Sequence, residues 1–220
     1  MLRIIPLALT LGLAACTKSE APPNEAALAE TTEVEAAGAP DTPTLEGPLP
    51  LGAEMPAADV EMKGVDGEMY TLSEIAGENG TLVIFTCNHC PYAKAWEERV
   101  AEIGNAYREK GIGVVAVNPN DPAKYEVDGY EGMQARSEKL GLEFPYVVDA
   151  TSDVARAYGA TKTPEAYLFD AEGALVYHGA IDDNAEAPEA VEDAYLKSAL
   201  EALLAREPVP MPETRAVGRS

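Results

Sequence analysis

Two continuous apolar runs form the strongest hydrophobic pattern in the chain. Residues 81–86 and 112–117 contain almost no polar positions, which is typical of strands buried on both faces of a sheet. Between them, apolar positions recur at helical spacing after Pro91 and continue to Gly111. These positions are Ala95, Trp96, Val100, Ile103 and Tyr107. The pattern therefore predicts a strand, a helix and a second strand in this part of the chain.

Other patterns predict the remaining elements. The residues Gly64-Val-Asp-Gly67 have the composition of a tight turn, so residues 60–62 and 69–72 are expected to pair as a hairpin. Helices are expected at 130–140, 152–158 and 188–205, and strands at 146–148, 166–169 and 175–178. Strands that alternate with helices and end in a hairpin predict an α/β fold with a central mixed β-sheet flanked by helices.

The chain before residue 51 lacks these patterns. Residues 17–50 are rich in Ala, Glu, Pro and Thr and have almost no large apolar side chains. Such a segment cannot bury enough surface to offset its chain entropy, so we expect a disordered acidic tether over residues 16–50. Residues 51–206 have the size of one globular domain, and residues 207–220 form a C-terminal tail.

The first residues carry an export pattern. Arg3 supplies a positive start, and residues 4–13 are apolar but too few for a comfortable transmembrane span. Leu13-Ala-Ala-Cys16 resembles the bacterial lipobox, which implies a signal peptide over residues 1–15, a lipid on Cys16 and a membrane anchor facing the periplasm. Thr17, in place of an aspartate, indicates the outer membrane. The alternative is an ordinary signal peptide cut nearby.

The charge balance excludes some partners. The chain has 38 acidic residues against 16 Lys and Arg, a formal net charge of −22. Nucleic acid phosphates need basic neutralisation, so we expect no nucleic-acid binding. The same charge opposes binding flat on an anionic leaflet. Beyond this, the charge indicates a soluble surface and names no partner.

Cys87-Asn-His-Cys90 is the candidate chemical site. With Cys16 set aside, Cys87 and Cys90 are the remaining sulfurs of the three cysteines. Two cysteines with two residues between them, at a strand end and a helix start, form a dithiol that can open and close. We place the first sulfur where helix amides and the macrodipole favour a thiolate. The sequence therefore predicts thiol-disulfide chemistry, with no cofactor and no metal.

A family resemblance appears at this point. Cys87-Asn-His-Cys-Pro91 after an apolar strand, together with Thr163-Pro164 before another strand, resembles the thioredoxin-like redoxins, which include the alkyl hydroperoxide reductase and thiol-specific antioxidant proteins. The resemblance covers residues 51–204 and implies a thioredoxin-like fold. It also implies that Pro164 is cis and faces the sulfurs, and that Thr163 pairs with an extended substrate chain.

The site residues take distinct expected roles. Cys87 is the expected nucleophile because it is the N-terminal and more exposed sulfur, and Cys90 would resolve the mixed disulfide. His89 would stabilise the Cys87 thiolate and make the couple more oxidising, or else be a solvent-exposed helix residue. Tyr92, Trp96 and Tyr167 could line a substrate groove or pack in the core.

Peroxidase activity is the nearest alternative within the family. Peroxiredoxins carry a P-x-x-x-T-x-x-C arrangement, whereas residues 82–85 here lack a proline and Thr86 directly precedes Cys87. We therefore expect peroxide turnover to be slow or absent. Some relatives end in Gly-Cys-Ser, but this chain has Gly218-Arg219-Ser220, so a mechanism with a distant resolving cysteine is unsupported.

Two further alternatives use the same cysteines. Cys87, His89, Cys90 and His178 could offer ligands to copper or zinc, although the short cysteine spacing beside Thr163-Pro164 favours redox chemistry. By itself His178 is expected to be a strand residue at a sheet edge. A purely structural disulfide would close a small loop and stabilise the domain only weakly.

These observations lead to an expected thiol-disulfide oxidoreductase of the bacterial cell envelope. Its partners would be client proteins with disulfides or dithiols, an unidentified redox partner, and the membrane through the N-terminal lipid. We expect a monomer. The direction of electron flow stays open at this point, and Cys87→Ser should abolish exchange while His178→Ala should not.

Overall fold

The computed structural model describes residue 45, residues 47–121 and residues 123–219. The predicted signal peptide, Cys16 and most of the predicted tether lie outside these residues, so their predictions stand untested. None of the described helices is long and apolar enough to cross a membrane.

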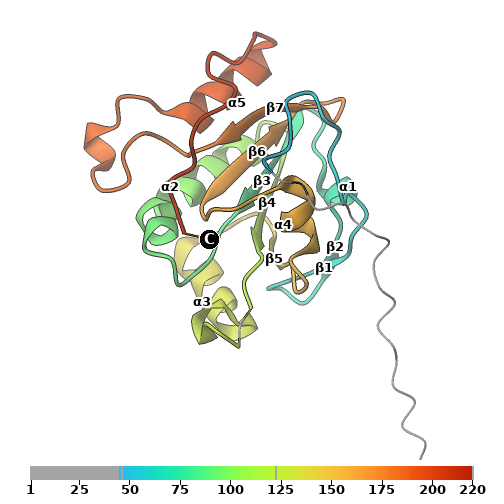
Figure 1. Cartoon of the computed structure of the whole chain (residues 1–220), viewed down its shortest axis with the longest axis vertical. Coiled ribbons are helices and arrows are strands. Elements are labelled where there is room, and N and C mark those ends of the chain that lie inside the picture. The colour runs from blue at the N-terminus through green and yellow to red at the C-terminus, as the bar shows by residue number, and fades with distance from the viewer. Residues whose placement is uncertain (1–44, 46, 122, 220) are drawn as a thin grey trace, which may run out of the picture. The chain divides into compact units, whose positions relative to one another are not determined.

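A seven-stranded sheet forms the centre of the domain, with the order β2-β1-β5-β4-β3-β6-β7 (Figure 1). Its strands are β1 Met62–Gly64, β2 Met69–Tyr70, β3 Gly80–Phe85, β4 Ile112–Asn118, β5 Tyr146–Val148, β6 Glu165–Phe169 and β7 Leu175–Gly179. The central strand β3 is parallel to β4 and antiparallel to β6. The sheet is therefore mixed, as the sequence predicted.

Helices cover both faces of this sheet. They are α1 Leu72–Ile75, α2 Pro91–Arg108, α3 Tyr130–Leu140, α4 Asp153–Tyr158 and α5 Tyr195–Ala205, with 3₁₀ turns at Glu126–Asp128 and Pro188–Ala190. Successive side chains of a strand point to opposite faces. Leu82 and Ile84 of β3 thus join one apolar core with α2, α3 and α5, whereas Val83 and Phe85 join a second core with α1 and α4. The continuous apolar run of β3 results from this burial on both faces.

The predicted helix 188–205 is correct only in its second half. Pro188 opens a short 3₁₀ turn, and α5 begins at Tyr195. Asp183 bonds across the intervening loop, because its backbone N–H donates to the carbonyl of Asp193 and its carboxylate accepts from Glu192 N–H. These contacts hold an acidic loop where the apolar spacing alone predicted a helix.

The hairpin prediction also changes at its second strand. Strand β2 ends at Tyr70, because Thr71 and Glu74 form a capping box that starts α1 at Leu72. Neither α1 nor the 3₁₀ turn Glu126–Asp128 was predicted, and the second of these places a functional residue described below.

Both ends of the described chain pack on the domain. Leu49, which the sequence placed in the tether, is buried and donates its N–H to Tyr158 O at 2.9 Å. In the predicted C-terminal tail, Thr214 N–H donates to His178 O at 3.1 Å, beside the edge strand β7. The folded domain thus extends beyond the predicted boundaries on both sides.

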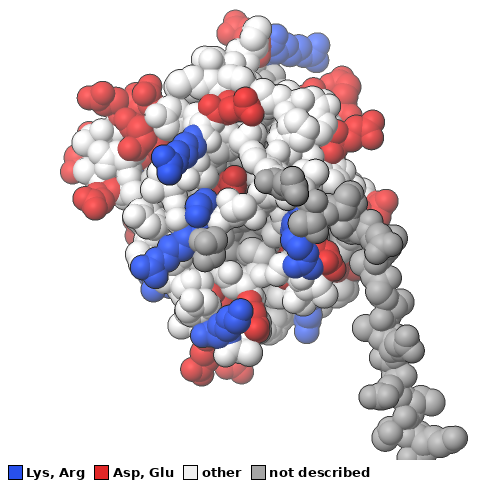
Figure 2. Space-filling model, viewed as in Figure 1, with Lys and Arg blue, Asp and Glu red and all other residues white. Residues whose placement is uncertain are grey.

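Charged side chains are not evenly spread on the face shown in Figure 2. Acidic side chains lie mostly around its margin, and Lys and Arg side chains lie nearer its middle. The view matches Figure 1, in which the marked C-terminus also lies near the middle. The strongly acidic composition is therefore not the local character of this part of the surface.

Candidate redox site

The two cysteines lie between β3 and α2. Strand β3 ends at Phe85, and α2 begins at Pro91 with Cys90 as its N-cap residue. Both cysteines are free thiols, and both are buried, with 5% of Cys87 and none of Cys90 exposed. The dithiol therefore lies between a deeply buried strand and the start of the longest described helix.

Thr163 contacts both sulfurs from a distant part of the sequence. Its hydroxyl lies 3.1 Å from Cys87 Sγ, and its carbonyl accepts a hydrogen bond from the Cys90 thiol at 3.3 Å. The bond between Thr163 and Pro164 is cis, as the resemblance implied. The structure therefore brings together the two motifs that the sequence singled out.

The two thiols differ in how readily they ionise. Burial raises the pKa of Cys87 to about 11; the negative charge of Asp128 adds to this rise, and the Thr163 hydroxyl opposes it. Burial also acts to raise the pKa of Cys90, but hydrogen bonds from the backbone of Ala93 and Arg219, with smaller contributions from Thr163 and the backbone of Tyr92, lower it overall. The more acidic thiol is therefore Cys90.

This result corrects one prediction. The sequence placed the helix amides at Cys87, but α2 begins only after Cys90, so the amides of its first turn face the second sulfur. A helix terminus favours negative charge only within its first turn. Cys87, three residues earlier, accepts a backbone hydrogen bond from the N-cap residue Cys90, but burial outweighs the resulting decrease in its pKa, so it needs another route to lose its proton.

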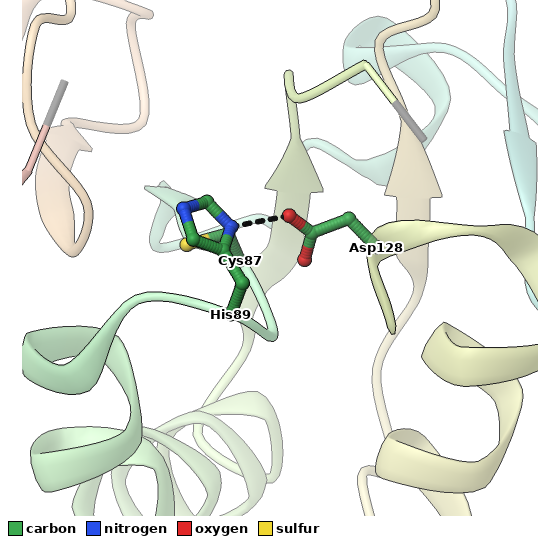
Figure 3. Close-up of side chains that lie close together, drawn as sticks. All are labelled: Cys87, His89 and Asp128. Carbon is green, nitrogen blue, oxygen red and sulfur yellow. Dashed lines mark hydrogen bonds and ion pairs between the residues drawn. The ribbon is translucent and has the colours of Figure 1, made fainter. Parts of the chain in front are cut away.

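Asp128 is the main residue of the site that sequence analysis missed. It belongs to the 3₁₀ turn Glu126–Asp128 and its side chain is fully buried. One carboxylate oxygen lies 2.5 Å from His89 Nδ1, and the other accepts the backbone N–H of Asn88 at 2.6 Å (Figure 3). Because the carboxylate supplies no proton, His89 donates from Nδ1. Asp128 thus fixes the dipeptide between the two cysteines.

A stacked ring completes the surroundings of His89. The ring of Tyr125 lies parallel to that of His89, with 3.6 Å between their centroids. The His89 side chain is 19% exposed, so it is neither a free surface residue nor part of the helix. Of the two roles expected for His89, the geometry is consistent with a partner of the dithiol.

Cys87, His89 and Asp128 form a compact cluster. The Cys87 sulfur, one ring nitrogen of His89 and one carboxylate oxygen of Asp128 all lie within 4.8 Å of one another. No second group of three such ligands occurs among the described residues. His178 instead lies on the edge strand β7, 3.1 Å from Glu213, so the ligand set with both cysteines and His178 is not assembled.

Two of the three aromatic residues considered for a substrate groove belong to the core. Trp96 and Tyr167 are buried, and Trp96 donates from Nε1 to the buried Asp182 at 2.7 Å. Tyr92 is 39% exposed on the first turn of α2. A groove lined by all three is therefore excluded.

Comparison of the sequence with models of known protein families identifies the family of this chain. The model of the AhpC/TSA family matches residues 53–178, which is more than half of the chain. The chain belongs to the AhpC/TSA family. The family match includes Cys87, Cys90 and Thr163-Pro164, and it confirms the thioredoxin-like redoxin fold that the motif suggested.

Two solved structures resemble this AhpC/TSA protein over most of its length. An uncharacterized conserved protein from Geobacillus kaustophilus is 35% identical, with a TM-score of 0.73, over 81% of this chain and 95% of its own. A hypothetical protein from Sinorhizobium meliloti 1021 is 33% identical, with a TM-score of 0.71, over 80% and 96%. Neither description gives an activity.

A curated relative does carry an activity in its name. The thiol-disulfide oxidoreductase ResA of Halalkalibacterium halodurans is 28% identical over 120 residues, which are 54% of this chain and 64% of that protein. This AhpC/TSA protein therefore spans somewhat less than two thirds of the length of that relative.

Proposed function

We propose that the chain is a thiol-disulfide oxidoreductase that exchanges a disulfide between Cys87/Cys90 and protein partners. The observation that carries the proposal is a pair of free thiols that follow the central strand β3 and both contact Thr163. The similarity to a protein named for this activity supports it. Reduction of a client disulfide would convert the dithiol to a disulfide and pass two electrons and two protons to the client.

Cys87 makes the first attack in this proposal because it is the more exposed sulfur. Its raised pKa leaves little thiolate near neutral pH, so a base must take its proton. His89 is the candidate, since a ring nitrogen lies within 4.8 Å of the sulfur and Asp128 holds Nδ1. The buried carboxylate then stabilises the imidazolium that forms.

Cys90 completes the reaction. Cys87 forms a bond to one client sulfur, and the other client sulfur leaves as a thiolate that takes up a proton. The thiolate of Cys90, favoured by the amides of α2, attacks Cys87 Sγ and releases the remaining client sulfur. The lowered pKa of Cys90 therefore suits the resolving step.

The decisive test separates the two cysteines. Purified full-length protein is assayed for reduction of insulin disulfides, with Cys16→Ser as the matched control that should keep full activity. Cys87→Ser should abolish exchange, whereas Cys90→Ser should accumulate a mixed disulfide between Cys87 and insulin because nothing resolves it. A mixed disulfide that forms through Cys90 in Cys87→Ser would reverse the roles, and activity in a variant lacking both would refute the proposal.

The direction of electron flow is read from the reduction potential. Equilibration in glutathione buffers should give a reversible Cys87/Cys90 couple, at about −270 mV for a reductant and about −120 mV for an oxidant. Metal is assayed on the same sample, because Cys87, His89 and Asp128 could bind a divalent cation. Stoichiometric metal without reversible cycling would favour a metal-binding function instead.

The cellular part of the proposal rests on sequence alone. Leu13-Ala-Ala-Cys16 resembles a lipobox, so Cys16 would carry the lipid and hold the domain at the bacterial envelope, facing the periplasm from the outer membrane. The acidic segment that follows would act as a tether and allow the domain to extend away from the membrane. Within this proposal the protein acts as a monomer, and its clients are dithiol or disulfide proteins of the same compartment.

A further inference from the structure

The last described residues lie against the dithiol. In Figure 1 the red C-terminal segment runs from the region of α5 and β7 to the marked C-terminus. We call residues 212–219 the C-terminal strap. Its first part binds the edge strand β7, and its last part contacts Thr163 and Cys90.

The first part of the strap is firmly anchored. His178 N–H donates to Pro212 O at 3.0 Å, and Thr214 N–H donates to His178 O at 3.1 Å. The Thr214 hydroxyl accepts Ala180 N–H at 2.9 Å and lies 2.8 Å from the Tyr177 hydroxyl. Residues 212–214 therefore continue the sheet as an added strand segment beside β7.

The last part of the strap covers the site through its backbone. Thr163 N–H donates to Arg219 O at 3.0 Å, and these two residues form an antiparallel bridge. A Cβ atom at Gly218 would lie 2.3 Å from Thr163 O, so this close approach requires glycine. The backbone of Arg219 also hydrogen-bonds Cys90.

The segment between these two contacts is held by little side-chain packing. Arg215, Val217 and Arg219 are exposed, and Val217 shows 46% of its surface. Ala216 and Gly218, which face inward, are small and only partly buried. A segment with few buried apolar contacts opens at a low free-energy cost. Residues 215–219 are therefore expected to open more readily than residues 212–214, which are bonded to β7.

The strap occupies a backbone donor that an extended client would use. A cavity of about 320 Å³ is lined by Thr163 and Arg219, whereas the cavity beside Cys87 on the side of α2 and α3 measures only about 30 Å³. An extended client that pairs with the chain just before β6 would use the backbone groups of Thr163, whose N–H is already bonded to Arg219 O. Client and strap therefore compete for the same hydrogen-bond donor.

We propose that residues 215–219 act as an intramolecular substitute for a client strand, closing the dithiol until an extended, disulfide-bearing segment of a protein displaces them. This inference rests on the proposed function, since it names the regulation of the same site. It requires no new chemistry: only one set of backbone hydrogen bonds is exchanged for another.

The test removes the strap in two independent ways. Deletion of residues 215–220 from the full chain, and Gly218→Val in the intact chain, should each raise the rate of insulin-disulfide reduction about tenfold. That factor is expected if the strap is released in about one molecule in ten. Val217→Ala, at an exposed position of the same segment, is the matched control and should keep the parent rate.

The outcomes separate this inference from the function beneath it. The proposed role of the strap is overturned if the parent is active but the rate of insulin reduction is unchanged or lowered in both Gly218→Val and the deletion variant. This outcome counts when both variants unfold thermally close to the parent. Absence of insulin reduction in the parent and every variant, together with absence of a reversible Cys87/Cys90 couple in glutathione buffers, overturns the proposed function itself and the strap with it. A rise in both strap variants without a rise in Val217→Ala supports the inference.

Discussion

The immediate surroundings of each sulfur decide which of the two thiols ionises more readily. Cys87 and Cys90 share a motif, yet burial raises the pKa of the first, while backbone hydrogen bonds lower that of the second. Asp128 adds negative charge next to Cys87 and also holds His89. Asp128 thus adds to the rise that burial causes in the pKa of Cys87, and it also positions the candidate base.

Asp128→Asn should separate these two effects. Loss of the charge lowers the pKa of Cys87, so iodoacetamide should alkylate Cys87 faster at neutral pH. Loss of the partner that stabilises the His89 imidazolium should slow insulin reduction by about 100-fold, the lower end for removal of a general base. Asp193→Asn, an exposed position, is the matched control. Insulin reduction at the parent rate in Asp128→Asn would contradict the role given to Asp128.

The pH dependence of Cys87 alkylation follows from its raised pKa. The thiolate fraction grows about tenfold for each pH unit below the pKa, and that pKa is about 11. In Cys90→Ser, which isolates the first thiol, the alkylation rate should therefore climb steadily from about pH 7 to about pH 10. A plateau near the pKa of an ordinary cysteine would show that burial does not control this thiol.

At the scale of elements, the start of α2 is the most consequential boundary. Pro91 is the first helical residue, so the amides of the first turn hydrogen-bond Cys90 and lower its pKa. Cys87 lies in the loop before the helix. The opposite side of the helix is fixed by Asp182, which follows β7. This buried carboxylate accepts from Trp96 Nε1 and forms an ion pair with Arg99.

Trp96→Phe tests how far this contact holds α2 in place. The variant leaves the buried Asp182 without one of its donors, which should lower the free energy of unfolding by about 1–3 kcal/mol. Urea denaturation measures the change. Tyr92→Phe, on an exposed part of the same helix, should change it by no more than about 0.5 kcal/mol. Equal effects of the two variants would argue against a stabilising role for the Trp96–Asp182 bond.

At the scale of the whole molecule, the net charge bears on how the domain would lie under the proposed lipid anchor. A chain of net charge −22 that is anchored by a lipid would be held away from anionic headgroups by repulsion. The Lys and Arg side chains near the middle of the face in Figure 2 are an exception to that charge.

Cys16→Ser should release the protein from the membrane. The proposed lipid is attached to this sulfur, and no described helix could replace it as a span. Metabolic labelling with palmitate and fractionation of the cell envelope would measure the effect. The unaltered protein should be labelled and sediment with membranes, and the variant should do neither; labelling of the variant would place the lipid elsewhere.

The sequence by itself determined the strand order along the chain, the dithiol and its second motif, because each depends on neighbouring residues and local periodicity. Tertiary structure alone decided the rest. Asp128 reaches His89 across 39 residues, and Arg219 reaches Thr163 across 56. Such contacts leave no periodic pattern in the sequence, since they arise only when segments outside the strands fold together beside the dithiol.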